Sequence, residues 1–444
     1  MGTFLNPGNQ EYQIAINSEI YVDKTPMIND LNQIVNTNQR FVSISRPRRF
    51  GKTMAADMIC SYYDREADSR SLFENRLITT VKAVNGYKEL NWDAFLGQFD
   101  VVRIVMTRFF KRGESVEKAL LDMQKMIIRD IRKVYPDADY YNDADLIQTI
   151  EDVYEFSKKQ FVIVIDEWDA LFRINIVDKN GQKIYLDFLR DLFKDNKRIA
   201  LAYMTGILPI KKYGQHSALN MFTEYSMMSP MRFAKYCGFT ADEVSSLCSE
   251  YGRDYGKMKD WYDGYEVSET IPPDPNHEMI DKTGKSPQAN RYSIYSPLSV
   301  VESVSTGQIR NYWNNTETYE ALAEYIRRDF DGLKESVALL MDGGRVHIDT
   351  LSYQNDMTDF TCRDDVLSLL VHLGYLGFDD RTGEVFIPNR EILDVFRTST
   401  KTEEWASTFW MFDLSQETLK ATWDKDAKKT DTEFKHHKCK IEQA

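Results

Sequence analysis

The tripeptide Gly51-Lys52-Thr53 has the residue types that hold a chain of phosphates. It follows the apolar run 41–45 and a short basic turn, and it opens a segment with helical spacing. In such a loop the backbone N–H groups surround the phosphates, the lysine reaches the β and γ oxygens, and the threonine hydroxyl binds Mg²⁺. We therefore predict a nucleoside triphosphate site. The residues expected to form it are Arg48, Arg49, Phe50, Gly51, Lys52, Thr53 and Met54.

The loop departs from the common G-x-x-x-x-G-K-[ST] pattern, because Arg46 occupies the position of the first glycine. Taken alone, Gly-Lys-Thr also fits an ordinary strand-to-helix turn with a solvated lysine. Two interpretations are likewise open for Arg48 and Arg49, which can reach a γ-phosphate or form only a basic loop surface.

A pair of acids gives the loop a second, independent context. The apolar run 161–165 ends in Asp166 and Glu167, and ligands of open α/β sheets bind at this end of a strand. We expect Asp166 to join Thr53 in holding Mg²⁺, and Glu167 to orient and deprotonate the attacking water. Together the two motifs predict an ATPase-type site that uses ATP and Mg²⁺.

A threonine follows another apolar run, 199–204. At that position the hydroxyl of Thr205 can lie near the γ-phosphate, as the residue called sensor 1 does in AAA-type ATPases. The alternative is that Thr205 only caps the next turn.

The elements that must position these residues alternate along the chain. Apolar runs at 101–106, 161–165 and 199–204 are separated by amphipathic stretches, which predicts a parallel sheet with helices. We expect an α/β P-loop NTPase domain over 1–230, irregular over about 1–20. Helices without strands are expected over 231–348, including 318–328, then a helix and hairpin of a winged-helix domain over 349–400. A poorly packed linker or tail is expected at 401–444.

Composition narrows the class of protein. With 444 residues, two or three domains are expected. The five cysteines show no CxxC spacing, which fits a reducing compartment, and no run of about 18 apolar residues exists to cross a membrane. We expect a cytoplasmic protein. The net charge of −13 disfavours nonspecific adhesion to nucleic acid.

Several motifs in order resemble the bacterial AAA-ATPase-like proteins that usually carry a C-terminal PD-(D/E)xK nuclease-like domain. The segments are YVDKT at 21–25, SRPRRFGKT at 45–53, IDEWD at 165–169, GFT at 238–240, WYDGY at 261–265 and YSPLS at 295–299. In that family an arginine replaces the first loop glycine, as Arg46 does here. The resemblance also implies that a nuclease-like domain would begin roughly where this chain ends, so we expect a chain without it.

The family is similar to the wider STAND group of signalling ATPases, in which a helical domain and a winged helix close over the nucleotide. This similarity implies a helical lid over 231–348 in which Pro297 packs on adenine, with Tyr21, Asp23 and Lys24 lining the same pocket. The alternative for Pro297 is that it only starts the helix at Leu298.

Three classes of function remain open. The first is a slow ATPase that acts as a switch for an effector, a partner or a second protomer; the second is a DNA-binding regulatory or defence ATPase that uses the winged helix; the third is a nucleotide-binding scaffold without turnover. Acidic residues balance the arginines around 379–397, which favours a protein partner over DNA. Glu167 favours the first class over the third, because a scaffold has no need of it.

Overall fold

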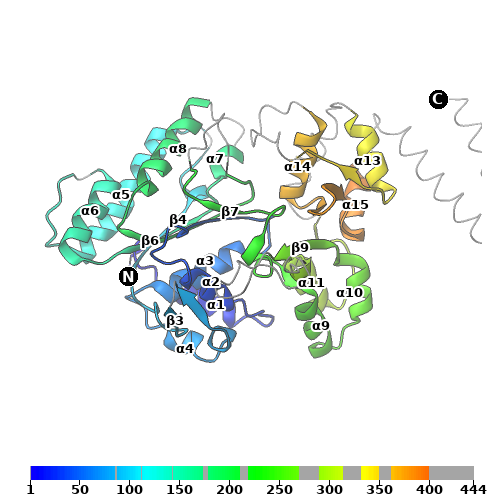
Figure 1. Ribbon diagram of the computed structural model, residues 1–444, viewed down its shortest axis with the longest axis horizontal. Helices are drawn as coiled ribbons and strands as arrows, with labels where there is room; N and C mark the ends of the chain where they lie inside the picture. The colour runs from blue at the N-terminus through cyan, green and yellow to red at the C-terminus, as the bar shows by residue number, and fades with distance from the viewer. Residues whose placement is uncertain are drawn as a thin grey trace, which may run out of the picture.

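The computed structural model of the protein describes residues 2–85, 88–111, 113–142, 144–173, 179–210, 219–269, 290–313, 332–349 and 362–399. Figure 1 shows a blue to green sheet flanked by helices, a smaller green part beside it, and a yellow to orange part nearer the C-terminus. The helix expected over 318–328 and the tail predicted at 401–444 lie outside the described residues.

A five-stranded sheet forms the centre of the first part, with the strand order β4-β5-β6-β1-β7. Its strands are β1 (Phe41–Ser45), β4 (Asp100–Val105), β5 (Phe161–Asp166), β6 (Ile199–Gly206) and β7 (Thr223–Tyr225). All neighbouring pairs are parallel, which confirms the predicted parallel sheet. The register pairs Ile44 with Thr205 and Val105 with Asp166, so the carboxyl ends of β1, β4, β5 and β6 meet at one edge.

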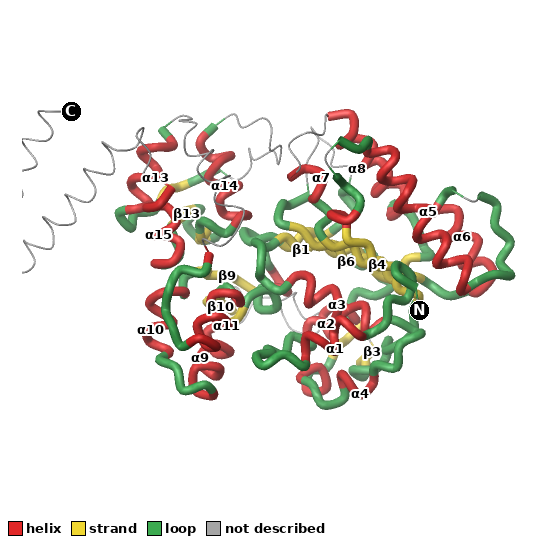
Figure 2. The backbone as a smooth tube through the Cα atoms, turned by 180° about the vertical axis from the view of Figure 1, so that it is seen from behind, coloured by secondary structure: helices red, strands yellow, loops and turns green. Residues whose placement is uncertain are grey.

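Helices cover both faces of this sheet (Figure 2). They are α1 (Gln10–Ile16), α2 (Pro26–Asn32), α3 (Lys52–Tyr63), α4 (Arg70–Phe73), α5 (Val116–Val134), α6 (Leu146–Ser157), α7 (Ala170–Arg173) and α8 (Lys179–Phe193). In β5, Phe161, Ile163 and Ile165 pack in the core with α5, α6 and α8, whereas Val162 and Val164 pack in the core with α2 and α3. Burial on both faces explains why the strand is apolar throughout.

The expectation of irregular chain over 1–20 is wrong, because α1 lies there. Tyr12 is the buried residue of this helix, and its ring stacks on Phe73 at a centroid distance of 5.2 Å. One buried position gives no apolar periodicity, so the sequence carried little signal for the helix. The remaining short elements here are β2 (Ala83–Asn85) and β3 (Lys88–Leu90), with 3₁₀ turns at Leu77–Thr80 and Met106–Arg108.

The second part corrects the prediction of an all-α region over 231–348. It contains a three-stranded antiparallel sheet, β8-β10-β9, besides its helices. The elements are a 3₁₀ turn (Met231–Phe233), β8 (Phe239–Thr240), α9 (Ala241–Glu250), α10 (Tyr255–Tyr262), β9 (Tyr265–Glu269), β10 (Asn290–Tyr295) and α11 (Pro297–Thr306). The strands are short and partly polar, and β9 and β10 lie far apart in sequence, so neither gave a clear strand pattern.

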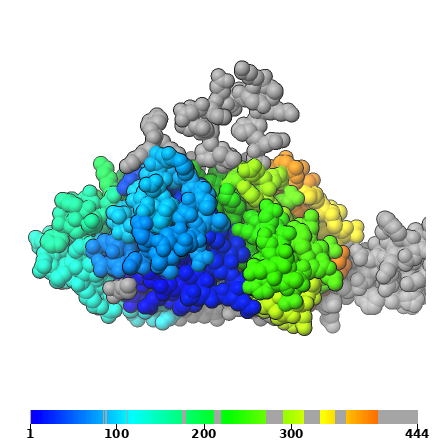
Figure 3. Space-filling model, turned by 90° about the horizontal axis from the view of Figure 1, so that it is seen from below, coloured from blue at the N-terminus to red at the C-terminus, as the bar shows by residue number. Residues whose placement is uncertain are grey.

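A capping box starts α9, since Thr240 and Glu243 bond each other's backbone N–H groups. Ile20 and Val22 from the N-terminal segment pack against the core of the second part. In addition, the hydroxyl of Tyr251 donates to the carbonyl oxygen of Glu19 at 2.7 Å. Figure 3 shows this dark-blue N-terminal surface lying against the green surface of the second part.

The third part contains α13 (Leu333–Met341), β11 (Val346–His347), α14 (Arg363–Leu373), β12 (Gly377–Asp379), β13 (Glu384–Phe386) and α15 (Arg390–Ser399). Strands β12 and β13 form the expected antiparallel hairpin after the expected helix α14. Strand β11 adds to the other side of β13. Among the described helices of the whole chain, none is long and apolar enough to cross a membrane.

Candidate nucleotide-binding site

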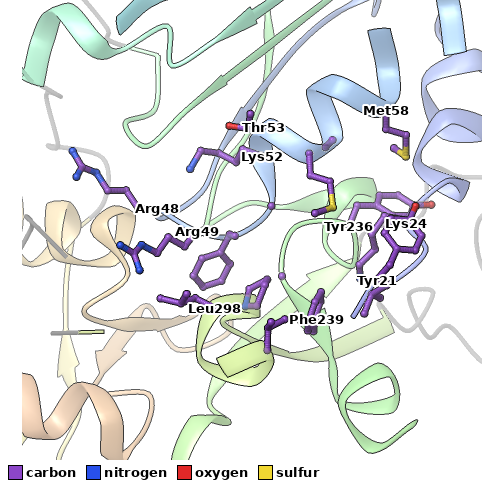
Figure 4. A pocket seen from close by; sticks show the side chains of 18 of the residues that line it. Tyr21, Lys24, Arg48, Arg49, Lys52, Thr53, Met58, Tyr236, Phe239 and Leu298 are labelled. Atoms are coloured by element: carbon purple, nitrogen blue, oxygen red, sulfur yellow. The ribbon is translucent and has the colours of Figure 1, made fainter. Parts of the chain in front are cut away.

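A cavity of about 710 Å³ lies at the carboxyl edge of the parallel sheet, between the loop before α3, the N-terminal segment and α11. Its wall includes most of the residues predicted from the sequence: Tyr21, Lys24, Arg48, Arg49, Phe50, Gly51, Lys52, Thr53, Met54, Glu167 and Pro297. Three predicted residues, Asp23, Asp166 and Thr205, do not line it. Figure 4 shows the arginines, Lys52 and Thr53 at one end, and Tyr21, Lys24 and Tyr236 at the other.

The basic loop turns sharply into α3. Arg49 and Gly51 have φ values of 66° and 81°, in the left-handed region. Helix α3 begins at Lys52, and residues 52–55 of its first turn line the cavity. The first N–H groups of a helix have no partner within the helix and carry partial positive charge, so this end of the cavity favours an anion.

The ammonium of Lys52 is held by its own loop. Its Nζ atom donates to the carbonyl oxygens of Arg46 at 2.9 Å and Pro47 at 2.7 Å. Burial lowers the pKa of Lys52 to about 8, although the carboxylates of Asp169 and Asp166 oppose this shift. A buried cation held by two neutral acceptors gains more from a bound anion than a solvated lysine does.

Arg46 is turned away from the cavity. Its side chain is buried, and Nη1 donates to the carbonyl oxygens of Ser45 at 2.9 Å and Tyr225 at 3.1 Å. The side chain therefore ties β1 to β7. An arginine is accommodated at this loop position because its side chain is buried against β7 and does not line the cavity.

The two acids at the end of β5 have different surroundings. Asp166 is buried and accepts a hydrogen bond from the hydroxyl of Thr205, with Nη2 of Arg103 at 3.8 Å from Oδ2. Glu167 has a φ of 55° and lines the cavity. Its backbone N–H lies 3.4 Å from the Thr205 hydroxyl oxygen. Thr205 thus connects both acids from behind and does not reach the cavity wall.

A magnesium ion fits the donors at this end. Thr53 offers a hydroxyl on the cavity wall, and Asp166 offers a buried carboxylate at the end of β5. The described residues hold no group of three or more His, Cys, Asp or Glu side chains suited to a metal. Oxygen donors in such small number suit Mg²⁺, which keeps several waters and binds substrate phosphates besides one or two carboxylates.

Arg173 also lies at this end, although sequence reasoning did not single it out. Arg173, in α7, lines the cavity and pairs through Nη2 with Oε2 of Glu167 at 2.9 Å. Its Nε lies 3.3 Å from Oδ2 of Asp169. Burial lowers the pKa of Arg173, but the carboxylates of Asp169 and Glu167 outweigh burial and raise it overall. The spacing of four between Asp169 and Arg173 was the available signal, because it brings side chains together on a helix.

The other end of the cavity is mainly apolar and aromatic. The apolar and aromatic residues of the cavity wall include Tyr12, Ile20, Tyr21, Val22, Met58, Tyr236, Phe239, Leu298 and Val301. Pro297, the first residue of α11, also lines the cavity. Sequence reasoning missed Tyr236 and Phe239, which are far from the loop in the sequence. Such a wall suits a flat, apolar ring system.

Lys24 and Asp23 have mainly structural contacts. Nζ of Lys24 lies 2.7 Å from both carboxylate oxygens of Glu243 and 2.7 Å from the carbonyl oxygen of Lys235, so it joins the N-terminal segment to α9. Burial lowers the pKa of Lys24 despite Glu243. The Asp23 carboxylate accepts from the backbone N–H groups of Thr25 and Leu77, both at 2.8 Å.

The loop also contacts the later parts of the chain. The ring of Phe50 meets Tyr265 edge-on at 5.7 Å, and the carbonyl oxygen of Phe50 accepts from the N–H of Gly238 at 3.1 Å. A Cβ added at Gly374, at the end of α14, would lie 2.8 Å from Pro47. Both the second and the third part therefore rest directly on the loop that contains Lys52.

A family model and one protein of known sequence match parts of this chain. Residues 8–215 match a family model described as "Predicted AAA-ATPase". A protein of Azotobacter chroococcum mcd 1, described as an uncharacterized protein in the vnfD 5′ region, is 23% identical over 331 residues that cover 71% of this chain. The chain spans about half of that relative, 55% of its length.

Two solved structures are similar at low identity. The Walker-type ATPase PABY2304 of Pyrococcus abyssi gives a TM-score of 0.38 at 12% identity, over 84% of this chain and 94% of that one. The Orc1 protein of Aeropyrum pernix, solved in complex with DNA, gives 0.27 at 11%, over 92% and 99%. The segment that holds the Lys52 loop and the acids Asp166 and Glu167 is similar to the predicted AAA-ATPases.

Proposed function

We propose that this chain binds ATP with Mg²⁺, hydrolyses it slowly, and uses the nucleotide to change how its later parts rest on the phosphate-binding loop. One observation carries the proposal. A single cavity has the basic loop and Glu167 at one end, an aromatic wall at the other, and Pro297 of the second part on its side. The basic loop suits the triphosphate of ATP, Glu167 suits the attacking water, and the aromatic wall with Pro297 suits the adenine ring.

At the phosphate end, Lys52 exchanges the carbonyl oxygens of Arg46 and Pro47 for the β and γ oxygens. The N–H groups of the first turn of α3 bind the same phosphates, and Arg48 and Arg49 lie on the same wall. Thr53 and Asp166 would hold Mg²⁺, which supplies positive charge to the phosphate oxygens when bound. Thr205 fixes the Asp166 carboxylate through its hydroxyl.

Hydrolysis then needs a base and a water. Glu167 accepts a proton from the water while the water oxygen forms a bond to the γ-phosphorus. The bond from the γ-phosphorus to the bridging oxygen breaks, and ADP leaves with that electron pair. Unless a partner or a second copy of the chain supplies a further positive charge, we expect turnover to be slow.

At the other end, adenine packs between Pro297 and the aromatic residues of the cavity. Because α11 belongs to the second part, the nucleotide touches that part directly. We propose that 1–230 is the ATPase domain, that the second part is a lid built of helices and one small sheet, and that the third part is a winged-helix domain. The boundary expected at 348 moves toward the N-terminus, because β11 pairs with β13 of the third part. Binding of ATP then favours one arrangement of the lid.

For the partner, we propose a protein effector, a second copy of the chain or a nuclease-like domain, in a cytoplasmic setting. The charges near the hairpin support a protein rather than DNA. Arg381 lies 2.7 Å and Arg291 3.6 Å from the carboxylate of Asp379, and Arg345 lies 3.4 Å from it. These arginines are paired with an acid and offer little free positive charge to phosphates.

The test measures ADP formation from Mg-ATP by the purified chain, with and without duplex DNA, beside the Lys52→Ala variant. We expect slow turnover by the parent chain, no turnover by the variant, and no acceleration by DNA. Absence of both ATP binding and turnover in the parent chain overturns the proposal. Strong acceleration by DNA replaces the protein effector with a nucleic-acid partner.

A further inference from the structure

Arg173 lies between two carboxylates that differ in how firmly they are held. Asp169 is fully buried, and its Oδ2 accepts from the backbone N–H groups of Ile207 at 3.1 Å and Leu208 at 3.0 Å. The side chain of Glu167, in contrast, is 37% exposed and lines the cavity. Asp169 is therefore a fixed partner of Arg173, whereas Glu167 can move away.

The contact with Arg173 conflicts with the role of Glu167 as a base. Nη2 of Arg173 lies 2.9 Å from Oε2 of Glu167, so one carboxylate oxygen already accepts a charged hydrogen bond. A carboxylate that accepts the proton of a water must turn a free lone pair toward that water. Glu167 can turn fully toward the water once another anion takes over the guanidinium.

We propose that this anion is the γ-phosphate of ATP, and that Arg173 is a catalytic residue that binds it and thereby releases Glu167. The inference rests on the proposed ATPase function of the same cavity. Arg173 shares the cavity wall with Lys52 and Arg48, and its side chain is only 15% exposed, so it is mostly shielded from competing water. A phosphate offers a guanidinium more charge and more acceptor oxygens than a carboxylate does.

This exchange of partners by Arg173 makes the availability of the general base, Glu167, depend on bound ATP. With ATP bound, Nη2 contacts a γ oxygen, Nε stays near Asp169, and Glu167 faces the water. With ADP bound, the γ-phosphate is missing and Arg173 returns to Glu167. The chain thus has an arginine of its own near the charge that develops during phosphoryl transfer, a role that a partner protein fills in some GTPases.

A purely structural ion pair makes different predictions. If Arg173 only neutralises the buried Asp169, its replacement lowers stability and leaves the preference between ATP and ADP unchanged. The ratio of the ADP and ATP dissociation constants therefore separates the two roles, because stability changes affect both nucleotides alike.

The first experiment measures Mg-ATP and Mg-ADP affinity by calorimetry in Arg173→Gln. We expect ATP affinity to fall by about tenfold or more, and ADP affinity to stay within about twofold. The matched control is Arg190→Gln in α8, which removes an arginine paired with Asp187 at 2.6 Å outside the cavity. The control should change neither affinity. An unchanged ratio in Arg173→Gln overturns the inference.

A second experiment keeps Arg173 in place and so does not depend on how its variant folds. In Glu167→Gln the neutral amide is a weaker partner for the guanidinium, so ATP should bind several-fold more tightly than in the parent chain, with ADP unchanged. Equal ATP affinity in Glu167→Gln and the parent also overturns the inference. Lys52→Ala separates a failure of the Arg173 role from a failure of the proposed function. If the parent chain binds both nucleotides and Lys52→Ala binds neither, the proposed function stands even where the Arg173 role fails.

Discussion

The Nζ atom of Lys52 lies 2.7 Å from the carbonyl oxygen of Pro47, and Pro47 in turn packs against Gly374 at the end of α14. The residue expected to bind phosphate and the third part of the chain thus share one contact in the loop. A phosphate that draws Lys52 away from Pro47 changes the same stretch of backbone on which α14 rests. Changes at the loop should therefore be detectable in both nucleotide affinity and the stability of the third part.

Replacing Lys52 by alanine should abolish ATP binding and leave the fold intact. The ammonium is a buried charge held by neutral carbonyls, so its loss removes a desolvation penalty along with two hydrogen bonds. Calorimetry with Mg-ATP measures the affinity, and thermal unfolding checks the fold. Lys118→Ala, at an exposed lysine of α5, is the control. Unchanged ATP affinity in Lys52→Ala would show that the cavity binds nucleotide elsewhere or not at all.

ATP affinity should fall as the pH rises above about 8. Only the charged form of Lys52 attracts phosphate, and its pKa in the folded chain is about 8. Between about pH 7 and about pH 9 the charged fraction, and with it the affinity, falls by about tenfold. Near pH 8.5 binding should also take up protons, which calorimetry in buffers of different ionisation enthalpy detects. Affinity that is constant over this range contradicts the assignment.

The contribution of Lys52 to the stability of the fold should increase as the pH rises, whereas the ATP affinity falls. Lys52 has a pKa of about 8 in the folded chain, below the ordinary lysine value of 10.5 that we assign to the unfolded chain. The unfolded chain therefore binds more protons between these values, and the Lys52 contribution to stability improves as the pH rises through the window. Comparison with Lys52→Met isolates this contribution. The free energy of unfolding of the parent chain should rise relative to that of Lys52→Met between about pH 8 and pH 10.5.

Glu167→Gln should keep ATP binding and lose turnover. The amide can still orient a water but cannot accept its proton. Glu155→Gln, at an exposed acid of α6, should leave the rate unchanged. The measurement is steady-state ADP release. A rate within about twofold of the parent, which corresponds to less than about 0.5 kcal/mol in the barrier, would mean that Glu167 is not the base.

The parts of the site that the sequence predicted are those in which one short segment carries the whole signal. The loop around Lys52 follows the buried strand β1, and the acids Asp166 and Glu167 follow residues 161–165 of β5, which are apolar and buried on both faces. Local spacing is enough for such motifs. The same reason explains why the parallel sheet was predicted with the right type of pairing.

The residues that were missed are brought to the cavity by the fold. Tyr236 and Phe239 lie far from the loop in the sequence and reach it through the second part, whose sheet β8-β10-β9 was also not predicted. Conversely, Asp23 and Thr205 have suitable side chains but bond backbone groups and a neighbouring acid. Residue type shows what a side chain can bind, whereas the packed structure decides which partner it has.

Gly374→Ala should be more destabilising than Gly343→Ala. Both glycines have left-handed φ values, 88° and 83°, so both alanines carry a similar backbone strain of about 1–2 kcal/mol. At Gly374 the new Cβ would also lie 2.8 Å from Pro47 and 3.1 Å from Trp313, whereas at Gly343 it would meet nothing within 4 Å. Thermal unfolding of the two variants measures the difference. Equal losses would mean that α14 does not press on the loop.

The last prediction concerns the lid. Pro297 lines the cavity, and two residues later the hydroxyl of Ser299 donates to the carboxylate of Glu391 in α15 at 2.7 Å. The same carboxylate accepts from the backbone N–H groups of Tyr312 at 2.7 Å and Trp313 at 3.1 Å. Helix α11 is thereby fixed to the third part. If adenine packs on Pro297, the second and third parts should respond together.

Hydrogen exchange and small-angle scattering of the free, ADP-bound and non-hydrolysable ATP-bound chain measure this response. We expect exchange in α11 and α14 to differ between ADP and the ATP analogue, because only the latter places a γ-phosphate against Lys52 and the loop. Helix α6, on the far side of the sheet, serves as the internal control and should exchange equally in all states. In Glu391→Gln a neutral amide replaces the carboxylate that accepts from Ser299 and from the backbone at 312–313, so these hydrogen bonds become weaker. Helix α11 should then still respond, whereas α14 should respond less. Identical profiles over 235–400 in all three states would leave a rigid nucleotide-binding protein in which Pro297 only starts α11.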